Sequence, residues 1–149
     1  MTAFPHEYVV TLVSSPRCDV YLSANRVPVM RSAAPAEFGG PGDRWSPETL
    51  LVAAVGDCFA ITFQAMARAA ELPWKSLRCE VTGTLDRQDG GPQFTRFELR
   101  ARLGVPAGTS EELAHRSLER AERGCLIARS LKAPVLLTAT IEQLEPAQV

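Results

Sequence analysis

Two cysteines, Cys58 and Cys125, stand where the sequence could place a reactive thiol. A cysteine attacks other molecules as its thiolate, and the backbone dipole at a helix start lowers the pKa of a thiol. Cys125 directly follows Gly124, where one helical pattern ends and a short segment begins. Cys58 lies inside the most apolar stretch of the chain. Both positions also suit an inert thiol, because free cysteine is among the most buried residue types.

Three charged residues lie where they could support a cysteine. Arg17 comes at a turn before a strand pattern, where an arginine is ordinarily a solvated surface residue. Glu48 falls in the first turn of a predicted helix, where an acid balances the helix dipole. Asp57 precedes Cys58 inside apolar sequence, so its carboxylate must be paired, capping a backbone group or open to water.

The other cysteines and the histidines give no sign of a metal or cofactor site. Cys79 falls on the inward face of a predicted strand, and Cys18 falls at the edge of another. Neither His6 nor His115 is close in sequence to a cysteine, and no Cys-x-x-Cys pair is present. Four cysteines are too few for a disulfide scaffold in a chain of 149 residues. We therefore expect free thiols and no bound cofactor.

A long helix should carry the glutamate, the aspartate and the first of the two cysteines. Ser46 and Pro47 form a strong helix start, and Pro73 cannot continue a helix, which predicts a helix from Pro47 to about Glu71. Its roughly 25 residues would span about 37 Å. The helix is apolar nearly all round, which is typical of a helix enclosed by protein. One small sheet could hardly cover both faces, so we expect a second subunit to do so, in a homodimer.

Alternating apolar and polar residues predict strands in much of the remaining chain. The predicted strands cover residues 8–13, 18–22, 27–30, 77–87, 94–105 and 135–144. A turn at 88–92 would join the two longest strands in a hairpin. A capping box at 109–112 should open a second helix that ends near Gly124, before a short turn or helix over 125–132. This order predicts an α+β fold, an antiparallel β-sheet with a long buried central helix.

The composition is that of an ordinary globular protein. One domain is expected over residues 1–149, with 46% hydrophobic and 22% charged residues and a net charge of −1. Nucleic acid and anionic membranes are poor candidates as partners, because both would require a clustered basic excess. The most apolar stretch is interrupted by Asp57, and the N-terminus lacks the pattern of a signal peptide. We therefore expect no membrane span and a cytoplasmic location.

Three segments carry a family resemblance: Phe38 to Gly42, Trp45 to Leu51 and Ala53 to Phe59, with a second cysteine after the C-terminal helix. Together they resemble the OsmC/Ohr family, the osmotically inducible and organic hydroperoxide resistance proteins. The resemblance covers essentially the whole chain, including the order of the elements. It implies an intertwined OsmC-like homodimer that reduces hydroperoxides by cysteine-based, thiol-dependent chemistry.

The resemblance also implies roles for individual residues. By position, Cys58 would be the peroxidatic cysteine and Cys125 the resolving one. Arg17 stands where the family has an arginine that activates the thiolate and orients the peroxide, and Arg26 is a competing match. Glu48 matches the family's glutamate that holds this arginine. An external dithiol would restore both thiols, and for some members of the family this is a lipoyl-type dithiol.

Other functions on the same scaffold remain open. Many relatives have proline after the second cysteine, whereas this chain has Leu126. A non-catalytic dimer that binds a hydrophobic ligand is one alternative, and a redox sensor without efficient turnover is another. If the apolar residues that follow Cys58 line a pocket, they would suit an organic peroxide. They could equally belong to the hydrophobic core: Phe59, Ile61, Phe63 and Met66.

Helix geometry limits how the charged residues can act. Glu48 and Cys58 are ten residues apart, which on one continuous helix is about 15 Å along the axis and roughly 80° around it. The two side chains cannot share one small site on the same helix. If Glu48 and Arg17 serve a cysteine, we expect them to serve Cys58 of the other subunit.

Overall fold

The computed structural model describes residues 3–146 and divides the chain into two compact units, Met1–Leu51 and Val52–Val149. The first unit holds three short strands: β1 (Thr11–Val13), β2 (Val20–Ser23) and β3 (Met30–Ser32). They pair antiparallel in the order β1-β2-β3, and each is shorter than the strand predicted there, with the third beginning where the predicted strand ends. A 3-10 turn at Ala36–Phe38 follows in the glycine-rich loop. The single domain expected over residues 1–149 stays a prediction.

The second unit contains a three-stranded sheet in the order β4-β5-β6. Strands β4 (Ser76–Gln88) and β5 (Gly91–Pro106) form the predicted hairpin through a tight turn at Asp89-Gly90. Strand β6 (Val135–Leu144) has the predicted bounds, but it pairs parallel to β5. The expectation of an antiparallel sheet is therefore wrong for this pair. The helical segment between the two strands is a crossover, and a crossover returns the chain in the same direction.

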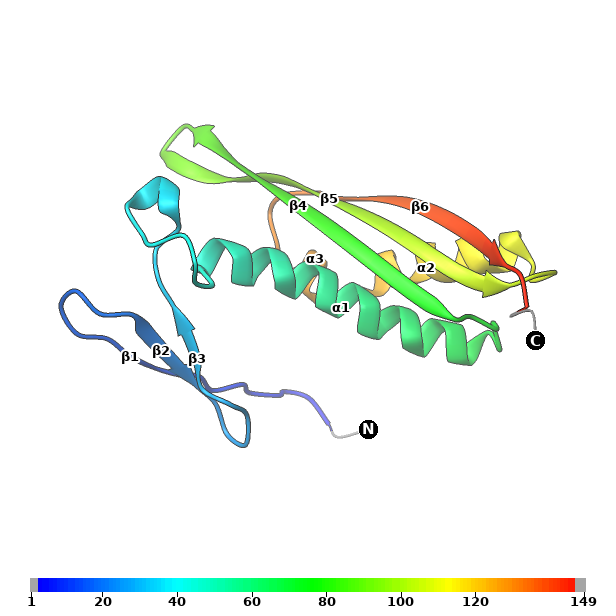
Figure 1. Ribbon diagram of the computed structural model, residues 1–149, viewed down its shortest axis with the longest axis horizontal. Helices are drawn as coiled ribbons and strands as arrows, with labels where there is room; N and C mark the ends of the chain where they lie inside the picture. The colour runs from blue at the N-terminus through cyan, green and yellow to red at the C-terminus, as the bar shows by residue number, and fades with distance from the viewer. Residues whose placement is uncertain (1–2, 147–149) are drawn as a thin grey trace. The chain divides into compact units, whose positions relative to one another are not determined.

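The core of this unit lies on one face of β5. The five apolar residues that alternate along this strand are all buried, as their periodicity predicts: Phe97, Leu99, Ala101, Leu103 and Val105. Helices α1 (Pro47–Ala69) and α2 (Glu111–Gly124) lie against that face, as Figure 1 shows. Helix α1 approaches β4 closely at Gly56. A Cβ atom at this residue would lie only 2.9 Å from a methyl carbon of Val81, so the approach requires glycine. The architecture is a mixed α+β fold.

Helix α1 begins where the sequence predicts and ends slightly earlier. The Ser46 hydroxyl accepts a hydrogen bond from the Thr49 backbone N–H (3.2 Å), and the Ser46 N–H donates to the Thr49 hydroxyl (2.9 Å). At the other end Glu71 adopts φ 52°, and the Leu72 N–H donates to the Ala67 carbonyl (2.9 Å). This is a Schellman motif with a glutamate at the position that glycine usually takes.

Helix α1 buries one face in this chain and leaves the other uncovered. The buried side chains recur every fourth residue: Val55, Phe59, Phe63 and Ala67. On the opposite face Asp57 and Ile61 are exposed, so Asp57 is open to water. By length and composition alone α1 could also cross a membrane, a test that core helices pass as well. Protein therefore covers one face of α1, as expected. Coverage of the other face by a second subunit stays a prediction.

Helix α2 and the short helix α3 (Leu126–Arg129) form the connection from β5 to β6. The hydroxyl of Ser110 caps α2 by accepting from the Leu113 N–H (3.2 Å). The expected capping box at 109–112 is therefore wrong by one residue. The N-cap is Ser110 and not Thr109, so the third helical position is Leu113 and not Glu112. Helix α2 ends at Gly124, as predicted, and the predicted short helix follows.

Candidate functional site: a cysteine pair at the start of α3

Cys58 and Cys125 lie together in the second unit. Cys58 is half-buried near the middle of α1, and Cys125 joins α2 to α3. Cys125 is 2% exposed, and its thiol faces the carbonyl oxygen of Val55 on α1 at 4.0 Å. Both cysteines are free thiols. The structure therefore brings the two sequence-predicted cysteines into one site.

The pKa of Cys58 is lowered from its ordinary value by its neighbours. Burial of the sulfur raises the pKa, and four hydrogen bonds together outweigh that effect. In decreasing order they come from the Ile127 N–H, the Cys125 thiol, the Leu126 N–H and the Thr62 hydroxyl. Two of these donors are backbone groups in the first turn of α3, where N–H groups have no partner inside the helix. The start of α3 therefore favours the thiolate of Cys58.

The pKa of Cys125 moves in the opposite direction. Burial of its thiol is the largest cause of the increase, and the nearby Cys58 sulfur raises the pKa further through a hydrogen bond and its charge. N–H groups of Ala128 and Ile127 only partly offset these effects. The sequence left open whether a helix start lowers the pKa of Cys125, and here burial raises that pKa instead. The start of α3 lowers the pKa of Cys58, whereas the raised pKa of Cys125 favours its protonated form.

Thr62 is a site residue that the sequence analysis missed. It lies one turn after Cys58, and its hydroxyl donates to the Cys58 carbonyl oxygen at 2.7 Å. A Cβ placed on Gly124 would lie 3.3 Å from the methyl carbon of Thr62, so the end of α2 approaches α1 at this point. The i, i+4 spacing from Cys58 was the available signal, because residues so spaced are neighbours on a helix surface.

Comparison with known proteins decides the family. The family model described as OsmC-like protein matches residues 40–140. The chain belongs to the OsmC-like family. It is 28% identical over 106 residues to the uncharacterized protein YmaD of Bacillus subtilis, a match that covers 69% of this chain and 71% of that protein. It is also 28% identical over 92 residues to Peroxiredoxin OsmC of Escherichia coli, covering 62% of this chain and 64% of the relative.

A solved structure confirms the OsmC-like fold. An OsmC-like protein of Vibrio cholerae superimposes with a TM-score of 0.83 at 17% identity, covering 91% of this chain and all of that one. The family resemblance of the sequence is thus confirmed. The family match includes Glu48, Cys58 and Cys125, whereas Arg17 precedes it.

The charged residues predicted to assist this OsmC-like site lie in the first unit, and their roles stay predictions. Arg17 and Arg26 are both exposed in turns with positive φ, 62° and 64°. Glu48 is half-buried in the first turn of α1, and its Oε2 atom is buried without a hydrogen-bond partner among residues 3–146. This carboxylate therefore has a free acceptor for a cation.

The other two cysteines differ from the pair. Cys79 is half-buried on β4, and burial raises the pKa of its thiol, which favours the unreactive protonated form. Cys18 is exposed beside Arg17 in the turn before β2. Within residues 3–146 there is no group of three His, Cys, Asp or Glu side chains that could hold a metal ion.

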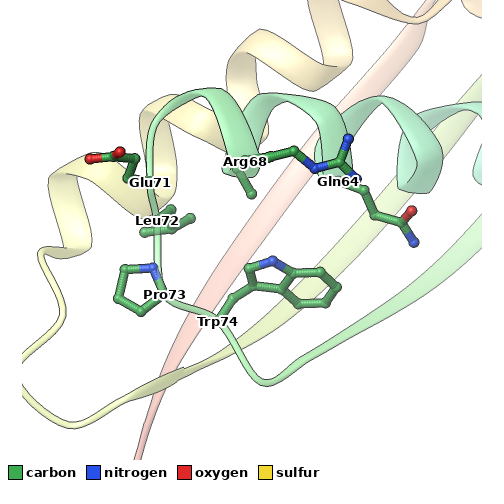
Figure 2. A pocket seen from close by; sticks show the side chains of 7 residues that line it. Gln64, Arg68, Glu71, Leu72, Pro73 and Trp74 are labelled. Carbon is green, nitrogen blue, oxygen red and sulfur yellow. The ribbon is translucent and has the colours of Figure 1, made fainter.

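A separate hollow of about 570 Å³ lies at the C-terminal end of α1 (Figure 2). Leu72, Pro73 and the Trp74 ring form its apolar part, and Figure 2 shows the Arg68 side chain extending past the ring towards Gln64. Trp74 packs edge-on against Phe63, with ring centroids 5.3 Å apart. The lining includes no cysteine, so this hollow is distinct from the thiol site.

Proposed function

We propose that this OsmC-like protein is a thiol-dependent peroxidase that reduces organic hydroperoxides. The observation that carries the proposal is the arrangement of donors around the Cys58 sulfur: the Cys125 thiol and two backbone N–H groups of α3. This arrangement favours a nucleophilic thiolate at Cys58 and a protonated thiol at Cys125 in one site. Peroxidase chemistry needs both.

In the first step the Cys58 thiolate attacks the terminal oxygen of the hydroperoxide. An S–O bond forms as the O–O bond breaks, so the sulfur is oxidised to a sulfenic acid and the peroxide is reduced. The alkoxide leaves and takes a proton from water to become an alcohol. The N–H groups of Leu126 and Ile127 stabilise the thiolate before the attack.

In the second step Cys125 resolves the sulfenic acid. Its sulfur attacks the Cys58 sulfur, a disulfide forms, and the oxygen leaves as water with the thiol proton. An external dithiol then reduces the disulfide by thiol exchange and becomes a disulfide itself. We take a lipoyl-type dithiol as the candidate reductant.

We also propose that the working unit is a homodimer. The uncovered face of α1 is one support, and the apolar residues of the first unit are another, with Tyr8 91% and Val9 77% exposed. Helix α1 is continuous from Pro47 to Ala69, so the separation of Glu48 from Cys58 along the helix stands. Arg17 of one copy would donate a hydrogen bond to the free Glu48 oxygen, and its charge would stabilise the Cys58 thiolate of the other copy.

Disulfide mapping tests the peroxidase proposal. The fully reduced protein receives one equivalent of cumene hydroperoxide, and its peptides are mapped by mass spectrometry. We expect a Cys58–Cys125 disulfide in the wild type and a sulfenic acid on Cys58 in Cys125→Ser. Oxidation confined to Cys18 or Cys79, or no loss of thiols, would contradict the proposal and favour a ligand-binding dimer. A disulfide without catalytic turnover on added dithiol would indicate a redox sensor.

A further inference from the structure

Thr62 places a hydroxyl group beside the sulfur of Cys58. Its oxygen lies 2.7 Å from the Cys58 carbonyl oxygen, to which it donates. Threonines in helices often make this bond to the carbonyl four residues earlier. Here the residue four positions earlier is Cys58, whose side chain lies on the same helix face, and the Thr62 hydroxyl also contributes to the lowered pKa of its thiol. One proton thus has two acceptors available, the carbonyl and the sulfur.

The methyl group of Thr62 limits how the side chain can turn. Threonine in a helix divides between two χ1 rotamers. The methyl carbon packs at the end of α2, where a Cβ on Gly124 would approach it to 3.3 Å. The bond to the Cys58 carbonyl shows that the hydroxyl occupies the rotamer on the Cys58 side. The proton can pass from one acceptor to the other by rotation about the C–O bond alone, without movement of the side chain.

We propose that Thr62 is a positioning residue whose hydroxyl turns from the Cys58 carbonyl to the Cys58 sulfur when that sulfur becomes a thiolate. A charged acceptor binds a donor more strongly than a neutral carbonyl does, so ionisation of the thiol drives the switch. The bond stabilises the thiolate and holds its direction towards the incoming peroxide. The role in peroxide reduction rests on the proposed function, whereas the hydrogen bond itself does not require a peroxide.

Two variants separate the hydroxyl from the shape of the side chain. Thr62→Val keeps the methyl contact with Gly124 and loses the donor, whereas Thr62→Ser keeps the donor. Ser117→Ala is the matched control, because Ser117 donates to the Leu113 carbonyl at 2.9 Å, the same kind of bond away from the cysteines. Circular dichroism checks that each variant folds.

The readout is the pH dependence of alkylation at each cysteine. The reduced full-length protein is labelled with isotope-coded iodoacetamide, and mass spectrometry follows Cys58 alone. We expect Thr62→Val to raise the pH midpoint of Cys58 alkylation by roughly half a pH unit to one pH unit. The midpoints of Thr62→Ser and Ser117→Ala should stay near that of the wild type. Equal midpoints for Thr62→Val and the wild type would overturn the inference, and so would an equal shift in Thr62→Ser.

A parallel assay keeps this inference apart from the proposed function. Wild-type protein is mixed with cumene hydroperoxide in a single turnover. Peroxide consumption by the wild type together with an unshifted Thr62→Val midpoint rejects the role of Thr62 and leaves the peroxidase standing. No consumption together with the expected shift rejects the peroxidase, and with it the positioning role in catalysis.

Discussion

Cys58 and Cys125 share one site, and the pKa values of their thiols shift in opposite directions. The causes differ: hydrogen bonds outweigh the effect of burial at Cys58, whereas burial of the thiol is the largest cause of the increase at Cys125. Cys58 on α1 receives the N–H groups of Leu126 and Ile127, whereas Cys125 is the N-cap residue of that helix and is more fully buried. One site therefore favours the thiolate at Cys58 and the protonated form at Cys125.

The first prediction concerns the order in which the thiols react as pH rises. A lowered pKa means that Cys58 ionises first, and the raised pKa values of Cys79 and Cys125 mean that they ionise later. Alkylation followed across pH 5 to about 10 should label Cys58 at the lowest pH of the three. Labelling of Cys79 before Cys58 would contradict the ionisation states assigned here.

The second prediction separates the two roles of Cys125. Cys125→Ser keeps a hydroxyl that can donate to Cys58, and Cys125→Ala does not. Both variants should accumulate Cys58 sulfenic acid after peroxide, because neither can close a disulfide. Only the alanine variant should raise the pKa of Cys58, since the Cys125 donor is one cause of its decrease. Dimedone trapping and alkylation midpoints measure the two effects, and a raised midpoint in the serine variant would refute the donor role.

The third prediction is a coupling between Gly124 and Thr62. Alanine ordinarily favours a helix over glycine by roughly 1 kcal/mol, but here its Cβ would crowd the Thr62 methyl carbon at 3.3 Å. In Thr62→Ser that methyl is absent, so Gly124→Ala should stabilise this background more than the wild type. We expect a coupling free energy of about 0.5–1 kcal/mol from urea unfolding of the four proteins. Additive effects would show that the two residues do not constrain each other.

The fourth prediction uses the end of α1. Glu71 adopts φ 52°, a left-handed conformation that costs a residue with a Cβ about 1 kcal/mol. Glu71→Gly should raise the free energy of unfolding by about 0.5–1 kcal/mol. Glu71→Ala is the control, because alanine keeps the Cβ and should gain nothing from relief of strain. A gain of the same size in both variants would mean that the glutamate charge, and not the backbone, is responsible.

The fifth prediction tests the dimer. Ile61 is 58% exposed on the uncovered face of α1, so a glutamate there would place a charge in the proposed interface. Sedimentation should show a dimer for the wild type and a shift to monomer for Ile61→Glu. Dilution of the wild type to monomer should also abolish peroxide reduction, because Glu48 and Arg17 would no longer reach the other copy's thiolate. Unchanged activity per chain in a proven monomer would disprove the shared site.

Several features could be predicted from neighbouring residues alone. Ser46 and Pro47 start α1 because a cap and a fixed proline φ act within one turn. The alternation from Phe97 to Val105 identifies the core face of β5, because side chains on a strand point to opposite faces in turn. The OsmC-like motif around Cys58 identifies the family and the first cysteine of the site.

Only the tertiary structure decided the pairing of β6, the uncovered face of α1 and the direction in which the pKa of each paired thiol shifts. A pattern of apolar residues marks which face is buried, and it does not say which strand lies alongside or in which direction. The pKa of Cys58 depends on Leu126, Ile127 and Cys125, which are far from it in sequence. Electrostatic effects act through space over a few ångströms, so they follow from the packing of α3 against α1 and not from sequence neighbours.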